Sequence, residues 1–116
     1  MANGIIIGWN RPITGREKQA GELFGASLAY FGRLQGEGKL DSFEPVIIAA
    51  HGGNLNGFFS LKGAPEKLDA LRHDNEFLKL VVQLGNCIDG LSVNHFYHGD
   101  RLMEVMGMWT ESQGGA

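Results

Sequence analysis

The chain has 116 residues, of which 43% are apolar and 20% are charged, so it has the composition of one globular domain and not of a disordered chain. Its formal net charge is −3, and the ten lysines and arginines are scattered singly. Without a basic stripe to neutralise phosphates, we do not expect the protein to bind nucleic acid.

The N-terminal third predicts one strand and one long helix. A strand is expected over residues 3–10, where three consecutive isoleucines indicate burial on both faces. Thr14 and Glu17 have the spacing of a capping box, which predicts a helix that begins near Gly15. The glycines from Gly36 onward end it.

Two strands and a hairpin are expected next. Residues 43–52 and 56–63 are apolar runs, and Gly and Asn residues at positions 52–56 are typical of the turn between them. Pro45 lies near the start of the first run and predicts an edge strand.

The remaining residues predict a second helix, a fourth strand and a short C-terminal helix. Pro65 opens the second helix and Gly85 ends it, before a strand over residues 90–99. The apolar spacing in 100–109 favours a helix, with a fifth strand after a tight turn as the alternative. Residues 111–116 are expected to form a flexible tail.

Three glycines interrupt the first predicted helix. Gly21, Gly25 and Gly32 lie on one helical face, and each costs about 1 kcal/mol relative to alanine. We interpret them as a place where the helix approaches a neighbouring element or a ligand closely.

The element order is β-α-β-β-α-β, which predicts an α+β domain of the ferredoxin-like type over residues 1–110. Its four-stranded antiparallel sheet would carry both helices on one face. Ile6 must then point away from the face that holds Ile5 and Ile7, and Phe58 away from that of Phe59. A sheet that is apolar on both faces needs a second cover, so we expect a homodimer in which sheet packs on sheet.

The chain resembles the dimeric α/β-barrel superfamily over residues 3–99. The resemblance rests on the element order, the two-faced strands and the helix GAPEKLDALRHDNEFLKLV at 63–82, which is similar to the second helix of antibiotic-biosynthesis monooxygenases. It implies a sheet-to-sheet dimer. It also implies activities that range from cofactor-free monooxygenases and isomerases to haem-degrading enzymes.

In this architecture, the space between the sheet and the helices often holds an apolar ligand. Trp9, Phe59, His95 and Tyr97 are the expected lining, because aromatic rings with a polar edge suit a small aromatic molecule. Asn10, His51 and His73 are further candidates for this pocket.

The haem-degrading pattern is incomplete in this sequence. Those enzymes carry an Asn on the first strand, a His on the second helix and a Trp on the third strand. Asn10 and His73 of this chain resemble the first two. Their third-strand tryptophan is missing, since that strand offers only phenylalanines. We therefore expect no haem or other cofactor.

Metal binding and nucleophilic catalysis are not expected either. Within one protomer, His51 ends the second strand at the sheet edge opposite to that of His95, so only a pairing across two protomers could bring them together. No carboxylate or cysteine lies at ligand spacing from either histidine. Cys87 follows a helix C-terminus, where the dipole disfavours a thiolate. As the only cysteine, it also predicts a reducing, cytoplasmic location, and no apolar run is long enough to span a membrane.

The sequence thus predicts a small dimeric protein that binds an apolar or aromatic molecule and has no clear catalytic set. The alternative is a cofactor-independent monooxygenase or isomerase that acts on an aromatic or polyketide-like substrate.

Overall fold

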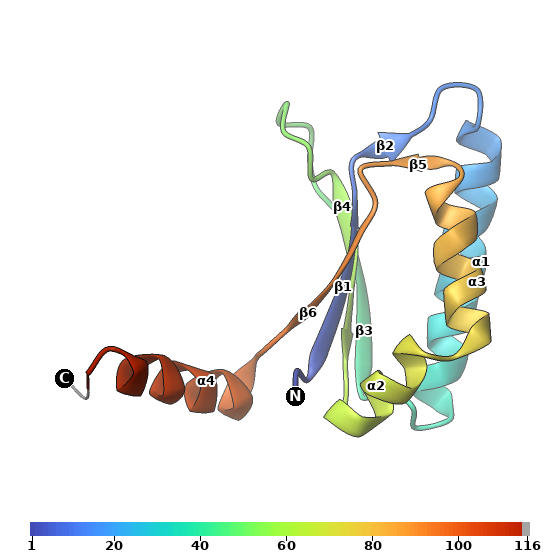
Figure 1. Cartoon of the computed structure of the whole chain (residues 1–116). Coiled ribbons are helices and arrows are strands. Elements are labelled where there is room, and N and C mark those ends of the chain that lie inside the picture. The colour runs from blue at the N-terminus through green and yellow to red at the C-terminus, as the bar shows by residue number, and fades with distance from the viewer. Residues whose placement is uncertain (115–116) are drawn as a thin grey trace.

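The computed structural model describes residues 1–114 (Figure 1). The strands are β1 (Gly4–Trp9), β2 (Arg11–Pro12), β3 (Ser42–Ile47), β4 (Gly57–Lys62), β5 (Ile88–Asp89) and β6 (Ser92–Phe96). The helices are α1 (Glu17–Gly36), α2 (Pro65–Arg72), α3 (Asn75–Gly85) and α4 (Gly99–Ser112).

The main sheet has the strand order β3-β4-β1-β6, with every neighbouring pair antiparallel. This is the order of the ferredoxin-like plan, and Pro45 lies on the edge strand β3, as predicted. Strands β2 and β5 pair with each other as a separate two-stranded ribbon. The sheet is open, because its two edge strands do not pair.

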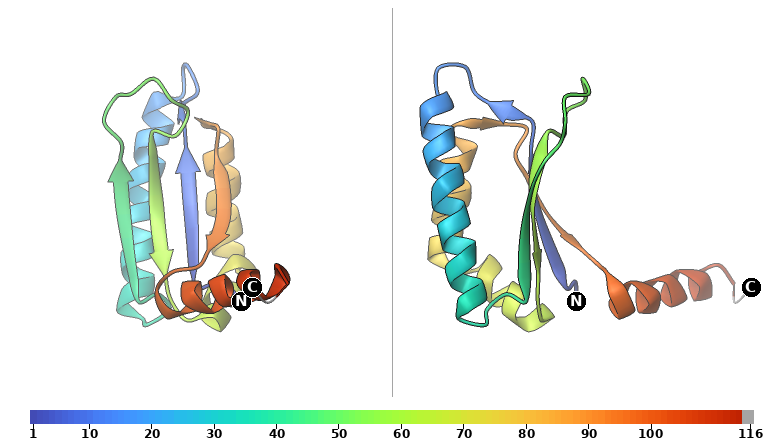
Figure 2. Two further views of the ribbon diagram at one scale, coloured as in Figure 1. Left: turned by 90° about the vertical axis from the view of Figure 1, so that its left-hand side faces the viewer. Right: turned by 180° about the vertical axis from the view of Figure 1, so that it is seen from behind.

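Helices α1, α2 and α3 cover one side of the sheet, which we call the helix-covered face (Figure 1). The other side, the open face, carries none of these three helices (Figure 2). The strand register places apolar and polar side chains on the open face. The apolar ones are Ile6, Val46, Phe58 and Phe96, and the polar ones are Ser42, Glu44, Ser60, Lys62, Ser92 and Asn94.

The hydrophobic core lies between the helix-covered face and the helices. Ile5 and Ile7 of β1 are fully buried there against Phe31 of α1. Ile6 lies between them in sequence and is only half-buried, since it points to the open face. Successive isoleucines of β1 therefore point to opposite faces of the sheet, as inferred from the sequence.

Helix α1 begins later than the sequence predicts. Its first residue is Glu17, preceded by Arg16 without a side-chain cap. The Glu17 carboxylate accepts a hydrogen bond from the Gly15 amide at 3.1 Å, so it does not form the expected reciprocal box with Thr14. The positive φ of Gly15, 91°, turns the chain just before the helix.

The single helix expected after Pro65 is two helices, and this part of the sequence prediction was wrong. Helix α2 ends at Arg72, His73 is its C-cap, and α3 begins at Asn75. The Asp74 carboxylate accepts a hydrogen bond from the Glu76 amide at 2.8 Å and caps α3. The polar residues between the helices therefore form a junction and not the exposed face of one helix.

The C-terminal segment is a helix, and the alternative of a fifth strand is excluded by α4. The helix extends through Ser112, two residues into the segment expected as a tail. Residues 115 and 116 of that segment lie outside the described residues. Within residues 1–114, no helix is both long and apolar enough to cross a bilayer.

Candidate functional site

A cavity of about 210 Å³ lies between the helix-covered face and helices α1 and α3. It opens at the end of the sheet where β1 finishes and the β2–β5 ribbon begins. Its lining is almost wholly apolar: Trp9, Pro12, Glu17, Ala20, Gly21, Phe24, Phe59, Leu84, Ile88 and Leu91.

Three aromatic rings form the floor and one wall of this cavity. The ring of Trp9 lies 5.0 Å from that of Phe59 and 6.1 Å from that of Phe24, measured between centroids. Phe24 and Phe59 stack with centroids 5.4 Å apart. The register explains the pairing, because Phe59 lies opposite Ile7 and Trp9 lies opposite Gly57 on the same face.

Gly57 makes room for the Trp9 ring. A Cβ atom at this position would lie 2.6 Å from the indole Cζ2, which is closer than side chains tolerate. The indole therefore lies across the β4 backbone and turns its exposed part toward the cavity. The glycine that precedes two phenylalanines in the sequence thus positions a residue of another strand.

Glu17 is the only ionisable residue in the lining and is exposed to solvent. Hydrogen bonds from its own backbone amide and from the Gly15 amide lower the pKa of its carboxyl group. The group is thus held as an anion that can accept a hydrogen bond from a ligand. It is a poor general acid for the same reason.

The expected pocket residues divide between two places. Trp9 and Phe59 line the cavity, whereas His95 lies opposite Ile5, four residues away along β1. His95 and Tyr97 share a separate shallow hollow of about 260 Å³ with the start of α2.

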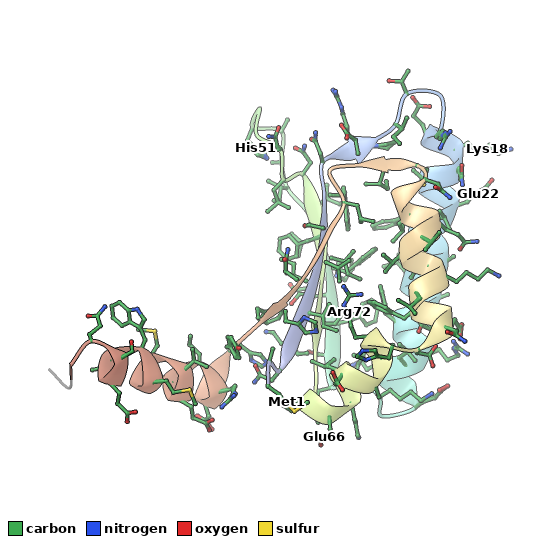
Figure 3. All side chains as sticks on the ribbon, in the orientation of Figure 1. Met1, Lys18, Glu22, His51, Glu66 and Arg72 are labelled. Atoms are coloured by element: carbon green, nitrogen blue, oxygen red, sulfur yellow. The ribbon has the colours of Figure 1, made fainter. Side chains whose placement is uncertain are left out.

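Asn10 and His51 serve local structure at the same end of the sheet as the cavity. The Asn10 side chain accepts a hydrogen bond from Asn56 at 2.6 Å, which ties the end of β1 to the β3–β4 loop. The ring nitrogens of His51 contact the Leu55 carbonyl at 2.7 Å and the Gly53 amide at 3.0 Å. His51 is therefore held within its own loop, at the tip shown in Figure 3.

His73 is exposed and stands apart from the cavity. Its Nδ1 lies 2.8 Å from the carbonyl oxygen of Asp69, one turn earlier in α2, so the ring folds back on its own helix. Across residues 1–114, no three His, Cys, Asp or Glu side chains gather closely enough to hold a metal ion.

Cys87 is fully buried at the end of α3. Burial raises the pKa of its thiol, and nearby Arg16 only partly offsets this. Its Sγ donates to the Gln83 carbonyl at 3.6 Å. Such a thiol is a poor nucleophile, because the thiolate is the reactive form.

No protein-family model and no curated protein matches this sequence. A solved structure, a dimeric protein of unknown function with a ferredoxin-like fold from Bacteroides fragilis NCTC 9343, matches 82% of this chain and 94% of its own. The TM-score is 0.59 and the identity is 8%. The ferredoxin-like fold is confirmed. This is the fold on which the resemblance to the dimeric α/β-barrel superfamily was based, and at this identity the comparison shows the fold alone.

A second solved structure has a weaker likeness. It is a 5-chloro-2-hydroxyhydroquinone dehydrochlorinase from Burkholderia phenoliruptrix AC1100 in complex with 2,5-dihydroxybenzoquinone. The match covers 84% of this chain and 96% of that one at 19% identity, with a TM-score of 0.45. A likeness of this size carries no conclusion about activity.

Several lining residues were not identified from the sequence. Phe24 belongs to α1, and Ile88 and Leu91 lie in and beside β5. Gly21 was a sequence signal for the cavity, since a glycine inside a helix leaves space beside the helix and this one lines the cavity. A Cβ at Gly21 or at Gly25 would meet no atom within 4 Å, so the interpretation as close helix packing was wrong at both positions.

Proposed function

We propose that this protein is a homodimer that binds a small apolar or aromatic molecule in the cavity under α1 and α3. The observation that carries the proposal is the aromatic cluster of Trp9, Phe24 and Phe59 at the wall of an open, nearly uncharged cavity. A site of this kind is typical of small-molecule binding, in which apolar walls supply affinity and few polar groups fix orientation.

The Glu17 carboxylate limits the class of ligand that the cavity would bind. The Glu17 carboxylate would accept a hydrogen bond from a hydroxyl or amine on a ligand whose ring lies against Trp9. An anionic ligand would be repelled by the same carboxylate. We therefore favour a neutral hydroxyaromatic compound over an aromatic acid.

The open face supports the homodimer. Ile6, Val46, Phe58 and Phe96 are partly exposed there, and no helix among residues 1–114 packs over them. In a two-fold dimer, these side chains would pack against their equivalents on the second copy. The Bacteroides fragilis protein of the same fold is described as dimeric, which is consistent with this arrangement.

Trp9 provides a direct test of ligand binding. In a Trp109→Phe variant, Trp9 is the only tryptophan, because the chain has two. Titration with neutral hydroxyaromatic compounds should change its fluorescence in a saturable way. The same titration with the matching carboxylates should give weaker binding.

Two substitutions in α1 separate cavity binding from surface binding. Gly21→Leu places a side chain at the cavity lining, whereas Gly25→Leu places it on the same helix outside the lining. We expect the fluorescence response to disappear in the first variant and to persist in the second. An undiminished response in Gly21→Leu would contradict the proposed site.

The mass in solution tests the dimer. Light scattering should give twice 12.6 kDa. Ile6→Lys puts a charge on the open face and should produce the monomer mass, while Ala29→Lys on the exposed side of α1 should not. A monomer mass for the unaltered protein would refute the homodimer without affecting the ligand site.

The compartment is a separate proposal. We infer a reducing cytoplasm from the single cysteine. The Cys87 thiol is fully buried and so is unavailable for an intermolecular disulfide in the folded protein. Its oxidation state therefore does not report the compartment, and cell fractionation tests the proposal: recovery of the protein outside the cytosolic fraction would refute it.

A further inference from the structure

Helix α4 carries an apolar stripe that no other part of residues 1–114 buries. Leu102, Val105, Met106 and Trp109 follow the i, i+3, i+4, i+7 spacing and fall on one side of the helix. No residue of α4 is buried, and Trp109 is 56% exposed. A helix with this pattern normally packs against a surface.

Within residues 1–114, the hydrogen bonds that tie α4 to the rest of the chain lie at its first turn. Nε of Arg101 donates to the Met1 carbonyl at 2.9 Å, and its guanidinium lies 5.7 Å from the centre of the Tyr97 ring. The remaining turns extend away from the sheet, as Figure 1 and the right-hand view of Figure 2 show. A helix of 14 residues is marginal on its own in water, so these turns need a partner.

The direction of α4 is fixed where it leaves the sheet. The Asn3 side chain accepts from the His98 amide at 3.0 Å and donates to the His98 carbonyl at 3.1 Å. The His98 ring also reaches the Asn3 carbonyl at 3.2 Å. These contacts join residues 95 positions apart in sequence, so the projection of α4 is built into the domain.

The position and charge of α4 indicate what covers the stripe. It projects on the side of the open face, where the proposed second copy would lie (Figure 1). The polar side of the helix carries Asp100, Glu104 and Glu111, which disfavours an anionic membrane surface. A second copy of the chain is therefore the favoured occupant.

The size of the open face supports the same occupant. Four strands of about six residues present a flat area of roughly 19 by 20 Å, or about 400 Å². A stable interface usually buries about 800 Å² on each partner. A face with this footprint is small for such an interface, and the apolar stripe of α4 adds apolar surface on the same side of the sheet (Figure 1).

We propose that α4 is an intermolecular arm whose apolar stripe packs on the second copy of the chain. The arm is about 21 Å long, whereas two packed sheets are about 10 Å apart. It therefore extends past the partner's sheet, and by two-fold symmetry each protomer holds the other. This inference rests on the proposed homodimer.

Trp109 fluorescence tests the arm directly. In a Trp9→Phe variant Trp109 is the only tryptophan, and its emission and acrylamide quenching can be followed with the scattering mass over a dilution series. We expect the emission to shift to the blue and the quenching to fall as the dimer forms. Both changes should follow the same concentration dependence as the mass.

Two methionines of α4 provide a matched pair in the otherwise unaltered chain. Met106 lies in the stripe and Met108 on another side of the helix, with exposed fractions of 45% and 53%. Met106→Ala should raise the dimer dissociation constant by about tenfold or more, as expected for an interface anchor. Met108→Ala should leave it unchanged.

The outcomes separate the arm from the dimer. A dimer in which Trp109 remains as accessible as in the unfolded chain, and in which Met106→Ala changes nothing, overturns the arm and leaves the homodimer intact. A monomer at all concentrations overturns both. The α4 variants should remain folded, since α4 contributes no buried residue. Circular dichroism checks the fold of every variant.

Discussion

The two faces of the sheet are built from alternate residues of the same strands, yet their environments differ sharply. On the helix-covered face Phe59 is 1% exposed, whereas its neighbour Phe58 on the open face is half-buried. Both are large apolar residues on β4. Local sequence pattern therefore does not determine their burial, which depends on whether another layer is present.

The faces also differ in composition. On the open face Ile6 lies between Ser60 and Asn94, while on the helix-covered face Ile5 lies between Leu61 and His95. A partner that covers Ile6 must also hydrogen-bond the two polar side chains beside it. An interface on the open face would thus allow fewer orientations of the partner than apolar packing alone would, because these hydrogen bonds must also form.

The largest expected effect comes from exchanging the two phenylalanines of β4 for alanine. Phe59→Ala should lower the free energy of unfolding by about 3–5 kcal/mol at any protein concentration, since it leaves a cavity in the core. Phe58→Ala should lower it by an amount that depends on protein concentration, because the proposed second copy would cover the exposed part of this ring. Urea unfolding at several concentrations measures both. A concentration-independent loss in Phe58→Ala would argue against an interface on the open face.

High pH should destabilise the helix-covered side through Tyr30. Burial, with the nearby carboxylates of Asp74 and Glu76, raises the pKa of Tyr30 to about 12 from 10.0. Between these values the unfolded chain releases the phenolic proton and the folded chain keeps it, so stability present below pH 10 is lost as the pH rises toward 12. The loss is about 2 kcal/mol.

The matched variants are Tyr30→Phe and Tyr97→Phe, which remove the two tyrosines of the chain in turn. Thermal unfolding between pH 9 and about 11.5 should lose most of this pH dependence in the first variant and keep it in the second. Tyr97 is the control because it is 42% exposed, whereas Tyr30 is 9% exposed. Identical pH profiles for both variants would show that Tyr30 does not carry the effect.

The strands could be predicted because their signals are local. The isoleucines of β1 and the phenylalanines of β4 identified buried strands, and the period of two assigned their faces. Pro45 located an edge. These inferences need only neighbouring residues and the geometry of one strand, so they did not depend on where the helices lie.

The break between α2 and α3 could have been predicted, but the signal was missed. Over nine residues of an unbroken helix, Phe77 would point about 180° away from Leu68. Both are fully buried, so the helix cannot be continuous. Asp74, an N-cap residue type, stands at the break.

The cavity could be predicted only in part. Trp9 and Phe59 were found because strand parity places both on the helix-covered face. The other walls depend on the distance and tilt of α1 and α3 relative to the sheet, which no short stretch of sequence encodes. His95 lies on that same face, but four residues farther along the sheet.

Asp74→Ala tests how firmly the helix layer is capped. The substitution removes the side chain that accepts from the Glu76 amide, and it should lower the free energy of unfolding by about 1 kcal/mol. Asp74→Asn keeps an accepting oxygen and should recover most of the loss. Asp69→Ala, in the middle of α2 and exposed, is a control that should have a smaller effect.

The smallest expected effect shows which side of the molecule the second copy covers. Gly25→Ala in α1 should raise the free energy of unfolding by about 0.5–1 kcal/mol, because alanine is the better helix former and its Cβ would meet nothing within 4 Å. This gain requires the outer surface of α1 to remain free in the assembled protein. If the second copy packed on α1 instead of on the open face, the added methyl group would lie in the interface and the gain would vanish or change sign as the dimer formed. Comparing the gain at concentrations below and above dimer formation therefore assigns the interface to one side of the sheet.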